Sequence, residues 1–203
     1  SKQKVDDGLF GNARIVIVGC GGAGGNTITR LHKLGVKGAE TIAINTDKIA
    51  LDLVDADKKL LIGKNLTRGL GAGGFPEQGE RAARESSREL EEMLQGADLV
   101  FVCAGMGGGT GTGASPVIAA VAKQMGALTI GVCTKPFVFE GAQRMRNAEV
   151  GIEQLRSEVD ALITIHNQKL LEVADDNMSI IEAFKLSDSI FNQGVQGISD
   201  LIV

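Results

Sequence analysis

The chain has 203 residues, of which 43% are hydrophobic, so its length and composition fit one α/β domain with a sizeable core. Its net charge of -4 and its lack of Trp and Tyr argue against the basic, base-stacking surface of a nucleic-acid-binding domain. We therefore expect no nucleic-acid partner.

Apolar runs alternate with segments of helical period, a pattern typical of parallel βαβ units. In chain order we predict a strand over 14–18, a helix over 26–34, strands over 41–44 and 60–62, a helix over 76–94, a strand over 98–104, a helix over 115–125, a strand over 128–133, a helix ending near 158, a strand over 160–165 and a helix over 179–203. Ser115 is the expected N-cap of its helix and Pro116 the first helical residue. The predicted fold is a three-layer α/β domain, Rossmann-like, with a mostly parallel sheet and helices on both faces.

The two ends of the chain carry expectations of their own. Residues 1–12 are predicted to be an N-terminal extension of a single nucleotide-binding domain that spans 1–203. The last helix carries apolar residues at helical spacing, and the chain ends on the apolar run Leu201-Ile202-Val203. We expect a truncated chain whose long helix leads towards an absent C-terminal domain.

Cysteine and histidine usage indicates a compartment. Cys20, Cys103 and Cys133 each lie in or just after an apolar run, which predicts buried, reduced thiols in a cytoplasmic protein. His32 and His166 are far apart, so no metal site built by protein side chains alone is expected. The uncharged stretch 99–122 is rich in Gly, Thr and Ser, which predicts no direct membrane insertion.

Glycine is concentrated in segments that directly follow predicted strands. Gly19, Gly21 and Gly24 satisfy G-x-G-x-x-G between the first strand and the first helix. Such a segment offers free backbone amides and a helix dipole to a phosphate, although a tight turn without ligand has the same pattern. Residues 107–113, GGGTGTG, offer more backbone amides than a structural turn requires, and two threonine hydroxyls in addition.

Two glycine segments at the carboxyl ends of two strands are expected to meet at one crevice of the sheet edge. One pyrophosphate needs one such segment, so two segments predict a nucleoside triphosphate. The pattern G-x-x-x-x-G-K-[ST] does not occur in the chain. Amides, helix dipoles and an ion such as Mg²⁺ must then neutralise the phosphates.

Residues 107–113 match the signature of the tubulin/FtsZ family, and other motifs follow in the order found in that family. These are Asn45-Thr46-Asp47, residues 69–74, Thr134-Lys135-Pro136-Phe137, Phe139-Glu140-Gly141 with Arg144, and Ala183-Phe184 with Asp188. The chain thus resembles the tubulin/FtsZ family over nearly its whole length and looks most like an archaeal FtsZ. The resemblance implies a domain that binds GTP or GDP with Mg²⁺.

The resemblance also implies nucleotide-binding residues. Those expected near the phosphates are Gly22, Ala23, Gly24, Gly25, Asn26, Asn45, Asp47, Gly73, Gly107, Gly108, Gly109, Thr110, Gly111 and Thr112. Asp47 has an alternative interpretation, as the acid that holds ribose in a dinucleotide fold. Residues 71–74 are expected to shape a loop that differs between triphosphate and diphosphate states.

The sugar and the base have further candidates. Glu140 and Arg144 match ribose and phosphate contacts of the family, although their spacing also suits an ordinary i,i+4 ion pair. Asp188 matches the residue that recognises guanine, because a carboxylate accepts from both N1–H and the exocyclic amine. Phe184 is expected beside the base, and Asn26 and Asn167 are additional candidates for base or sugar contact.

The family's activity implies partners that this chain alone does not provide. Subunits of the family stack head to tail into filaments of a division ring, and an acidic loop of the next subunit positions the hydrolytic water. No residue here matches that loop, so the catalytic residues are unknown and weak hydrolysis by the chain alone is expected. Cell-division partners are expected through the absent C-terminal part, at the division site.

Two alternatives stay open on sequence. An NAD-dependent oxidoreductase shares one G-x-G-x-x-G after a first strand, but it leaves residues 107–113 without a role. A structural module that keeps nucleotide without turnover is equally consistent with the glycine segments.

Overall fold

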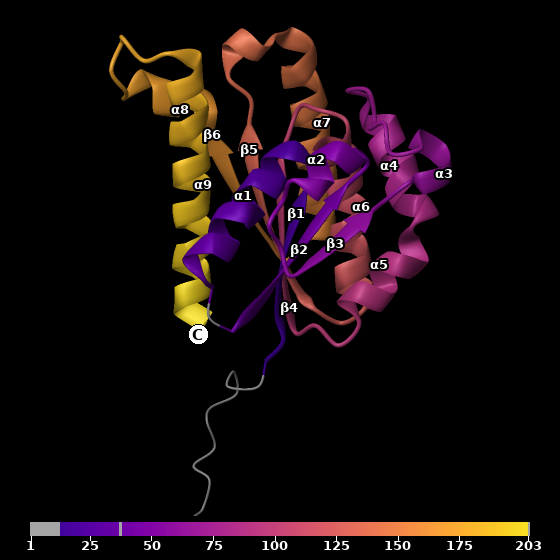
Figure 1. Ribbon diagram of the computed structural model, residues 1–203. Helices are drawn as coiled ribbons and strands as arrows, with labels where there is room; N and C mark the ends of the chain where they lie inside the picture. The colour runs from indigo at the N-terminus through magenta and orange to yellow at the C-terminus, as the bar shows by residue number, and fades with distance from the viewer. Residues whose placement is uncertain (1–12, 37, 203) are drawn as a thin grey trace, which may run out of the picture.

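One parallel sheet forms the centre of the molecule (Figure 1). The structure, a computed structural model, describes residues 13–36 and 38–202, with side chains described to residue 197. The strands are β1 (Ile15–Cys20), β2 (Ala39–Asn45), β3 (Lys58–Leu61), β4 (Leu99–Gly105), β5 (Leu128–Lys135) and β6 (Ala161–His166). They pair in the order β3-β2-β1-β4-β5-β6, every pair parallel. The predicted α/β fold with a parallel sheet is confirmed.

Helices cover both faces of the sheet. On one face lie α1 (Gly21–Leu34), α2 (Lys48–Asp52) and α9 (Ile180–Ile202); on the other lie α4 (Pro76–Glu85), α5 (Ser87–Leu94), α6 (Thr110–Gln124) and α7 (Ala142–Glu158). Strand alternation supplies both cores, because Ile15 and Ile17 pack towards α1 while Val16 and Val18 pack towards α6. Both cores are largely aliphatic, as the scarcity of aromatic residues requires.

The strand order reverses direction between β1 and β4. The chain moves from β1 outward to β2 and β3, then returns to β4 beside β1 and moves outward the other way. Connections after β1 and β4 therefore leave on opposite faces, which opens a crevice at the carboxyl ends of these two strands. Both glycine segments begin at this crevice.

The first glycine segment has no loop, so the predicted gap between strand and helix over residues 19–25 is wrong: Gly19 and Cys20 belong to β1 and the rest to α1. Helix α1 begins at Gly21, not at Asn26. Glycine disfavours helix by about 1 kcal/mol per residue, but close packing outweighs that cost here. A Cβ on Gly24 would lie 2.7 Å from the Cys103 carbonyl oxygen, and one on Gly19 would lie 2.3 Å from that of Gly24. Only glycine lets the helix start this close to β1 and β4.

The predicted start of α6 is also wrong. The helix begins at Thr110, so Ser115 is not an N-cap and Pro116 lies inside the helix. The Ser115 hydroxyl is buried and has no hydrogen-bond partner among the described residues. A Cβ on Gly111 would lie 2.7 Å from the Gly105 carbonyl oxygen, so tertiary contact again selects glycine within a helix.

The predicted helix over 76–94 is two helices. They separate at Ser86, whose hydroxyl accepts a hydrogen bond from the Gly63 backbone N–H at 3.0 Å. Short helices that the sequence did not reveal are α2, α3 (Lys64–Thr67), α8 (Asn167–Glu172) and the 3₁₀ turn η1 (Val138–Glu140). The other predicted elements are present, with ends that shift by a few residues.

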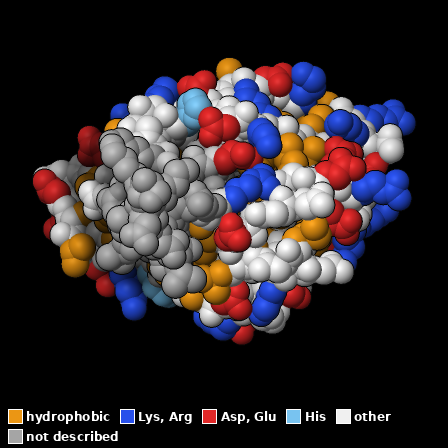
Figure 2. All heavy atoms as spheres, turned by 90° about the horizontal axis from the view of Figure 1, so that it is seen from below, with side chains coloured by type: hydrophobic (Ala, Val, Ile, Leu, Met, Phe, Trp, Pro, Cys, Tyr) orange, Lys and Arg blue, Asp and Glu red, His pale blue; other side chains and the backbone are white. Residues whose placement is uncertain are grey.

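The remaining expectations concern the surface and the thiols. All three cysteines are buried and reduced, as predicted. No helix in the described part of the chain is long and apolar enough to cross a membrane. Figure 2 shows the molecule from below, where acidic and basic side chains are interspersed around the atoms drawn in grey. The predicted extension, residues 1–12, lies outside the described residues.

Candidate functional site

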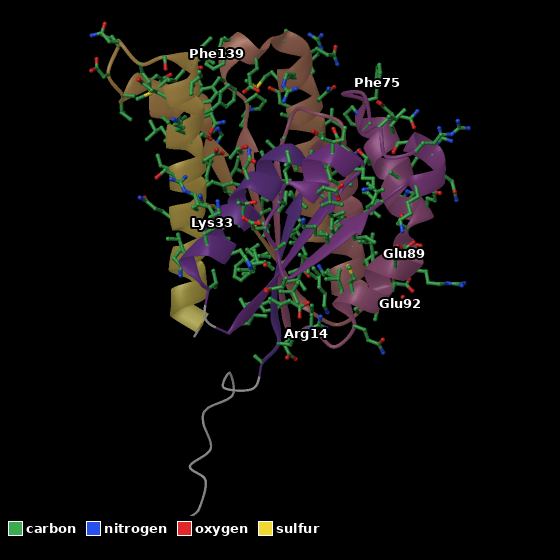
Figure 3. The ribbon with its side chains drawn as sticks, viewed as in Figure 1. Arg14, Lys33, Phe75, Glu89, Glu92 and Phe139 are labelled. Carbon is green, nitrogen blue, oxygen red and sulfur yellow. The ribbon has the colours of Figure 1, made fainter. Side chains whose placement is uncertain are left out.

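A cavity of about 510 Å³ lies at the carboxyl ends of the strands. Of the residues expected to bind nucleotide, its lining includes Gly22, Ala23, Asn45, Asp47, Gly73, Gly108, Gly109, Thr110, Gly111, Glu140, Arg144, Asn167, Phe184 and Asp188. Phe75 and Phe139 mark the same upper end of the molecule in Figure 3, whereas Arg14 lies at the opposite end. Because residues of both glycine segments line this cavity, the two segments meet at a single site.

Two helices begin at this cavity without a side-chain cap. The residues before them, Cys20 before α1 and Gly109 before α6, provide no side-chain hydrogen bond to the first turn. The first amides of each helix lack an intrahelical acceptor, and each helix dipole places about half a positive charge at that end. Gly22 and Ala23 of α1, and Thr110 and Gly111 of α6, line the cavity. Two such ends facing one cavity form an anion site without any lysine.

Five of the expected residues do not line the cavity. Gly24 and Gly25 are buried. Gly24 packs against β4, and a Cβ on Gly25 would lie 3.0 Å from the Val54 side chain. Asn26 is exposed on α1. Gly107 has a φ of 119° and its N–H donates to the Thr112 hydroxyl at 2.8 Å. Gly107 and Thr112 thus stabilise the turn before α6 without lining the cavity.

The segment after β2 presents an acidic side chain, that of Asp47, to the cavity. Asn45 is buried, and its Oδ1 accepts from the backbone N–H groups of Thr46 at 2.8 Å and Asp47 at 3.3 Å. One Asp47 oxygen, Oδ1, caps α2 by accepting from the Ala50 N–H at 3.0 Å. No hydrogen bond or ion pair of its second oxygen is seen among the described residues. One carboxylate with phosphate oxygens and water suits Mg²⁺, so the residues present fit this ion.

Glu140 and Arg144 both line the cavity. Their side chains make an ion pair at 3.3 Å, as the ordinary interpretation of their i,i+4 spacing expects. Glu140 also accepts the Phe137 backbone N–H at 2.8 Å, which fixes its position. The Arg144 side chain is half exposed, and a guanidinium nitrogen lies 3.8 Å from where a Cβ on Gly108 would be. Arg144 can therefore reach an anion at the start of α6.

The far end of the cavity is built by α8 and α9. Asp188 is half-buried there; burial raises the pKa of its carboxyl group, and the positive charge of Arg30 on α1 opposes this rise. Ser187 donates its hydroxyl to the Asn167 side-chain oxygen, which leaves the Asn167 amide group as a donor. Phe184 contacts the stacked rings of Phe137 and Phe139 edge-on. An acceptor, a donor and an aromatic ring thus line the same cavity.

Other lining residues were not among the expected binding residues. They are Gly21, Thr46, Ala50, Leu70, Gly71, Ala72, Gly74, Gly105, Met106, Thr134, Pro136, Ser187 and Phe191. Several belong to motifs that the sequence analysis quoted, such as Thr46 between Asn45 and Asp47. Ser187 and Phe191 carried no signal beyond helical spacing from Phe184 and Asp188.

Comparison with known proteins relates this chain to one family. The profile described as "Tubulin/FtsZ family, GTPase domain" matches residues 14–175. "Cell division protein FtsZ 2" of Methanocaldococcus jannaschii is 58% identical over 193 residues, which is 95% of this chain and 50% of that protein.

Solved structures agree with the sequence match. An empty FtsZ dimer from M. jannaschii superposes with a TM-score of 0.91 at 53% identity, over 94% of this chain and 55% of its own. A GTPγS-bound CetZ2 protofilament from Haloferax volcanii gives a TM-score of 0.80 at 25% identity, over 92% of this chain and 58% of its own. The chain spans about half the length of the relatives it matches.

Proposed function

The chain belongs to the Tubulin/FtsZ family, and we propose that it is the GTP-binding part of a cell-division GTPase that assembles into filaments. The observation that carries this proposal is the pair of uncapped helix starts that face one cavity, with a carboxylate at the cavity's far end. The helix starts suit a chain of phosphates, and the carboxylate suits guanine.

The phosphates lie between α1 and α6 in this proposal. The amides of Gly22, Ala23, Thr110 and Gly111 donate to phosphate oxygens, and Arg144 adds a positive charge from the side. Residues 71–74 and Asp47 close the distal end, where a third phosphate lies. Asp47 would hold Mg²⁺ together with phosphate oxygens, and the ion would supply the remaining charge neutralisation. Gly24, Gly25, Gly107 and Thr112 are proposed to act on the nucleotide through the shape of these two helix starts, and Asn26 stays a proposed base or sugar contact.

The base lies between Phe184 and Asp188. An ionised Asp188 accepts from N1–H and the exocyclic amine of guanine, and adenine offers no such pair of donors. Asn167 donates to the base or the sugar, and Glu140 accepts from the ribose hydroxyls. The oxidoreductase alternative leaves the α6 start idle although it lines the same cavity as the α1 start.

Hydrolysis and assembly are proposed for the longer protein. Subunits stack head to tail, as the printed description of the CetZ2 protofilament indicates for that relative, and an acidic group of the neighbouring subunit positions the water. Cell-division partners bind outside this chain, and the protein acts in the cytoplasm at the division site. The non-hydrolysing alternative predicts no phosphate release even from the longer protein.

Ligand-dependent thermal unfolding tests nucleotide binding. GTP or GDP at about 100 times its dissociation constant stabilises the folded state by about 2.7 kcal/mol, which raises the melting temperature by about 5–11 °C in a chain of this size. ATP and NAD at the same concentration are expected to give no rise. Equal protection by ATP or NAD would overturn the guanine assignment.

A matched pair of variants tests the base contact. Asp188→Asn replaces an acceptor by an amide, and we expect GTP affinity to fall by about 10- to 100-fold, as for a lost hydrogen bond to a charged group. Asp176→Asn makes the same change at an exposed position before α9 and should leave the affinity unchanged. Phosphate release by this chain, compared with a chain extended to the relatives' full length, tests hydrolysis separately.

A further inference from the structure

Thr46 connects two parts of the site that are far apart in sequence. It lies directly after β2, is fully buried, and places its hydroxyl oxygen 2.6 Å from that of Thr110, the first residue of α6. Either hydroxyl is able to donate in this pair. The contact links the end of β2 to the helix start that faces the phosphates.

The backbone of Thr46 holds the neighbouring loop, residues 67–75. Its carbonyl oxygen accepts from the Gly71 N–H at 3.2 Å and from the Thr67 hydroxyl at 3.3 Å. The next residues continue the attachment, because Lys48 N–H donates to the Gly69 carbonyl at 3.0 Å. The same loop meets α6 directly: a Cβ on Gly109 would lie 2.8 Å from the Ala72 side chain and 3.0 Å from the Phe75 amide. Thr46 is therefore the common support of the loop and of Thr110.

The number of protons in the Thr46–Thr110 hydroxyl pair indicates which hydroxyl donates to the other. Each threonine hydroxyl has one proton to donate and two lone pairs that accept. Among the described residues, the Thr46 hydroxyl has Thr110 as its partner. Thr110 also lines the cavity, where phosphate oxygens offer only acceptors. Both residues border the cavity, but Thr46 has no exposed surface whereas Thr110 is 8% exposed. The arrangement that uses both protons is therefore the one in which Thr46 donates to Thr110 and Thr110 donates into the cavity.

We propose that Thr46 is a positioning residue that turns the Thr110 hydroxyl proton towards the terminal phosphate and ties this contact to the loop 67–75. This inference rests on the proposed function, which places a third phosphate at the distal end of the cavity. A diphosphate does not reach that end, so the Thr46–Thr110 relay stabilises the triphosphate state selectively. The loop, attached to the Thr46 carbonyl, is held in place with it.

The ratio of two dissociation constants, that of GDP over that of GTPγS, measures this role. Thr46→Val keeps the shape of the side chain and removes the hydroxyl, so the ratio should fall about three- to tenfold, the size of one neutral hydrogen bond. Thr46→Ser restores the hydroxyl and should restore the ratio to within about twofold. Thr41→Val is the matched control, because Thr41 is a buried, hydrogen-bonded threonine at the other end of the same strand. It should leave the ratio unchanged whatever it does to the melting temperature.

A double-mutant cycle separates a relay from a general packing effect. Thr110→Val tests the contact from the other side and should lower the ratio by at least as much as Thr46→Val. The double variant should be no worse than Thr110→Val alone, because Thr46 acts only through Thr110. Additive losses, or a Thr46→Val ratio equal to that of the original protein, would overturn the inference. Should Thr46→Val fail to fold, the Thr110→Val ratio alone decides, since an unchanged value excludes the relay.

Trypsin cleavage after Arg68 provides a second readout. Arg68 is exposed in the loop, with a φ of 54°. GTPγS should slow this cleavage more than GDP does in the original protein and in Thr41→Val, and this difference should disappear in Thr46→Val. If the original protein binds neither nucleotide, the proposed function itself fails; if it binds both and all variants keep its ratio, only the role of Thr46 fails.

Discussion

Among the glycines of the described residues, Gly113 leaves the least room for a Cβ, at the point where α6 packs against α4. A Cβ at this position would lie 1.8 Å from the Pro76 carbonyl oxygen and 2.7 Å from the Glu80 nitrogen. Ordinary contacts begin at about 3.4 Å, so Gly113→Ala requires the first pair of atoms to separate by about 1.6 Å. Both obstacles are backbone atoms, and no rotamer change relieves them.

The cost of this substitution follows from the contact. Overpacking typically costs 1–3 kcal/mol, and a clash with backbone belongs at or above the upper end, about 3 kcal/mol. Alanine stabilises a helix by about 1 kcal/mol relative to glycine, which offsets part of this cost. The net loss of about 2 kcal/mol or more lowers the melting temperature by about 4–8 °C in a chain of this length.

Gly194→Ala is the matched control. Gly194 also lies inside a helix, α9, but a Cβ there meets nothing within 4 Å. Only the propensity gain of about 1 kcal/mol remains, so the melting temperature should rise by about 2–4 °C. Differential scanning fluorimetry of both variants checks the opposite signs. The reasoning is refuted if Gly113→Ala has the same melting temperature as the original protein, or if the melting temperatures of both variants shift in the same direction. Either result would show that the contact at Gly113 does not decide the outcome.

Three further predictions use pKa directions. The proposed guanine contact requires the ionised form of Asp188, whose pKa is raised by burial. GTP affinity should therefore fall with acidification from a pH above the ordinary range of aspartate, and Asp188→Asn should abolish this pH dependence in isothermal calorimetry. The hydrogen bond from the Thr129 N–H, at 2.8 Å, lowers the pKa of the Asp160 carboxyl group. The stability that this bond gives the folded protein is present at pH values above the ordinary pKa range of aspartate, and it is lost as the pH falls through the lowered pKa. Urea unfolding should therefore show Asp160→Asn as less stable at neutral pH and equal to the original protein in acid. Burial raises the pKa of Cys20 to about 12, so mass spectrometry should find this thiol unalkylated by iodoacetamide at about pH 8 until denaturant is added, and rapid native labelling would contradict its burial.

The sequence predicted the location of the site because the relevant signal is local. Parallel strands end at one edge of a sheet, so glycine-rich segments after the first and fourth strands had to meet there. Motif resemblance added Asp188, Glu140 and Arg144, which line the cavity with those segments. Their individual roles stay predictions until nucleotide binding is measured.

The sequence failed where packing reverses a local preference. Glycine and proline disfavour helix, so Gly21 and Thr110 were not recognised as helix starts and Pro116 was placed at one. Contacts with neighbouring strands outweigh that preference, and they involve residues far away in the chain. For the same reason Thr46 was passed over between Asn45 and Asp47, since its importance depends on a hydroxyl that is 64 residues distant.

The amino-acid pattern by itself determined the parallel α/β order and the strand ends at which the anion site is proposed, because alternation, helical period and glycine runs are properties of neighbouring residues. Only the tertiary structure decided which backbone amides face the cavity, where the helices begin and which side chains meet across it. These outcomes depend on contacts between distant segments, and a Cβ either fits such a contact or does not.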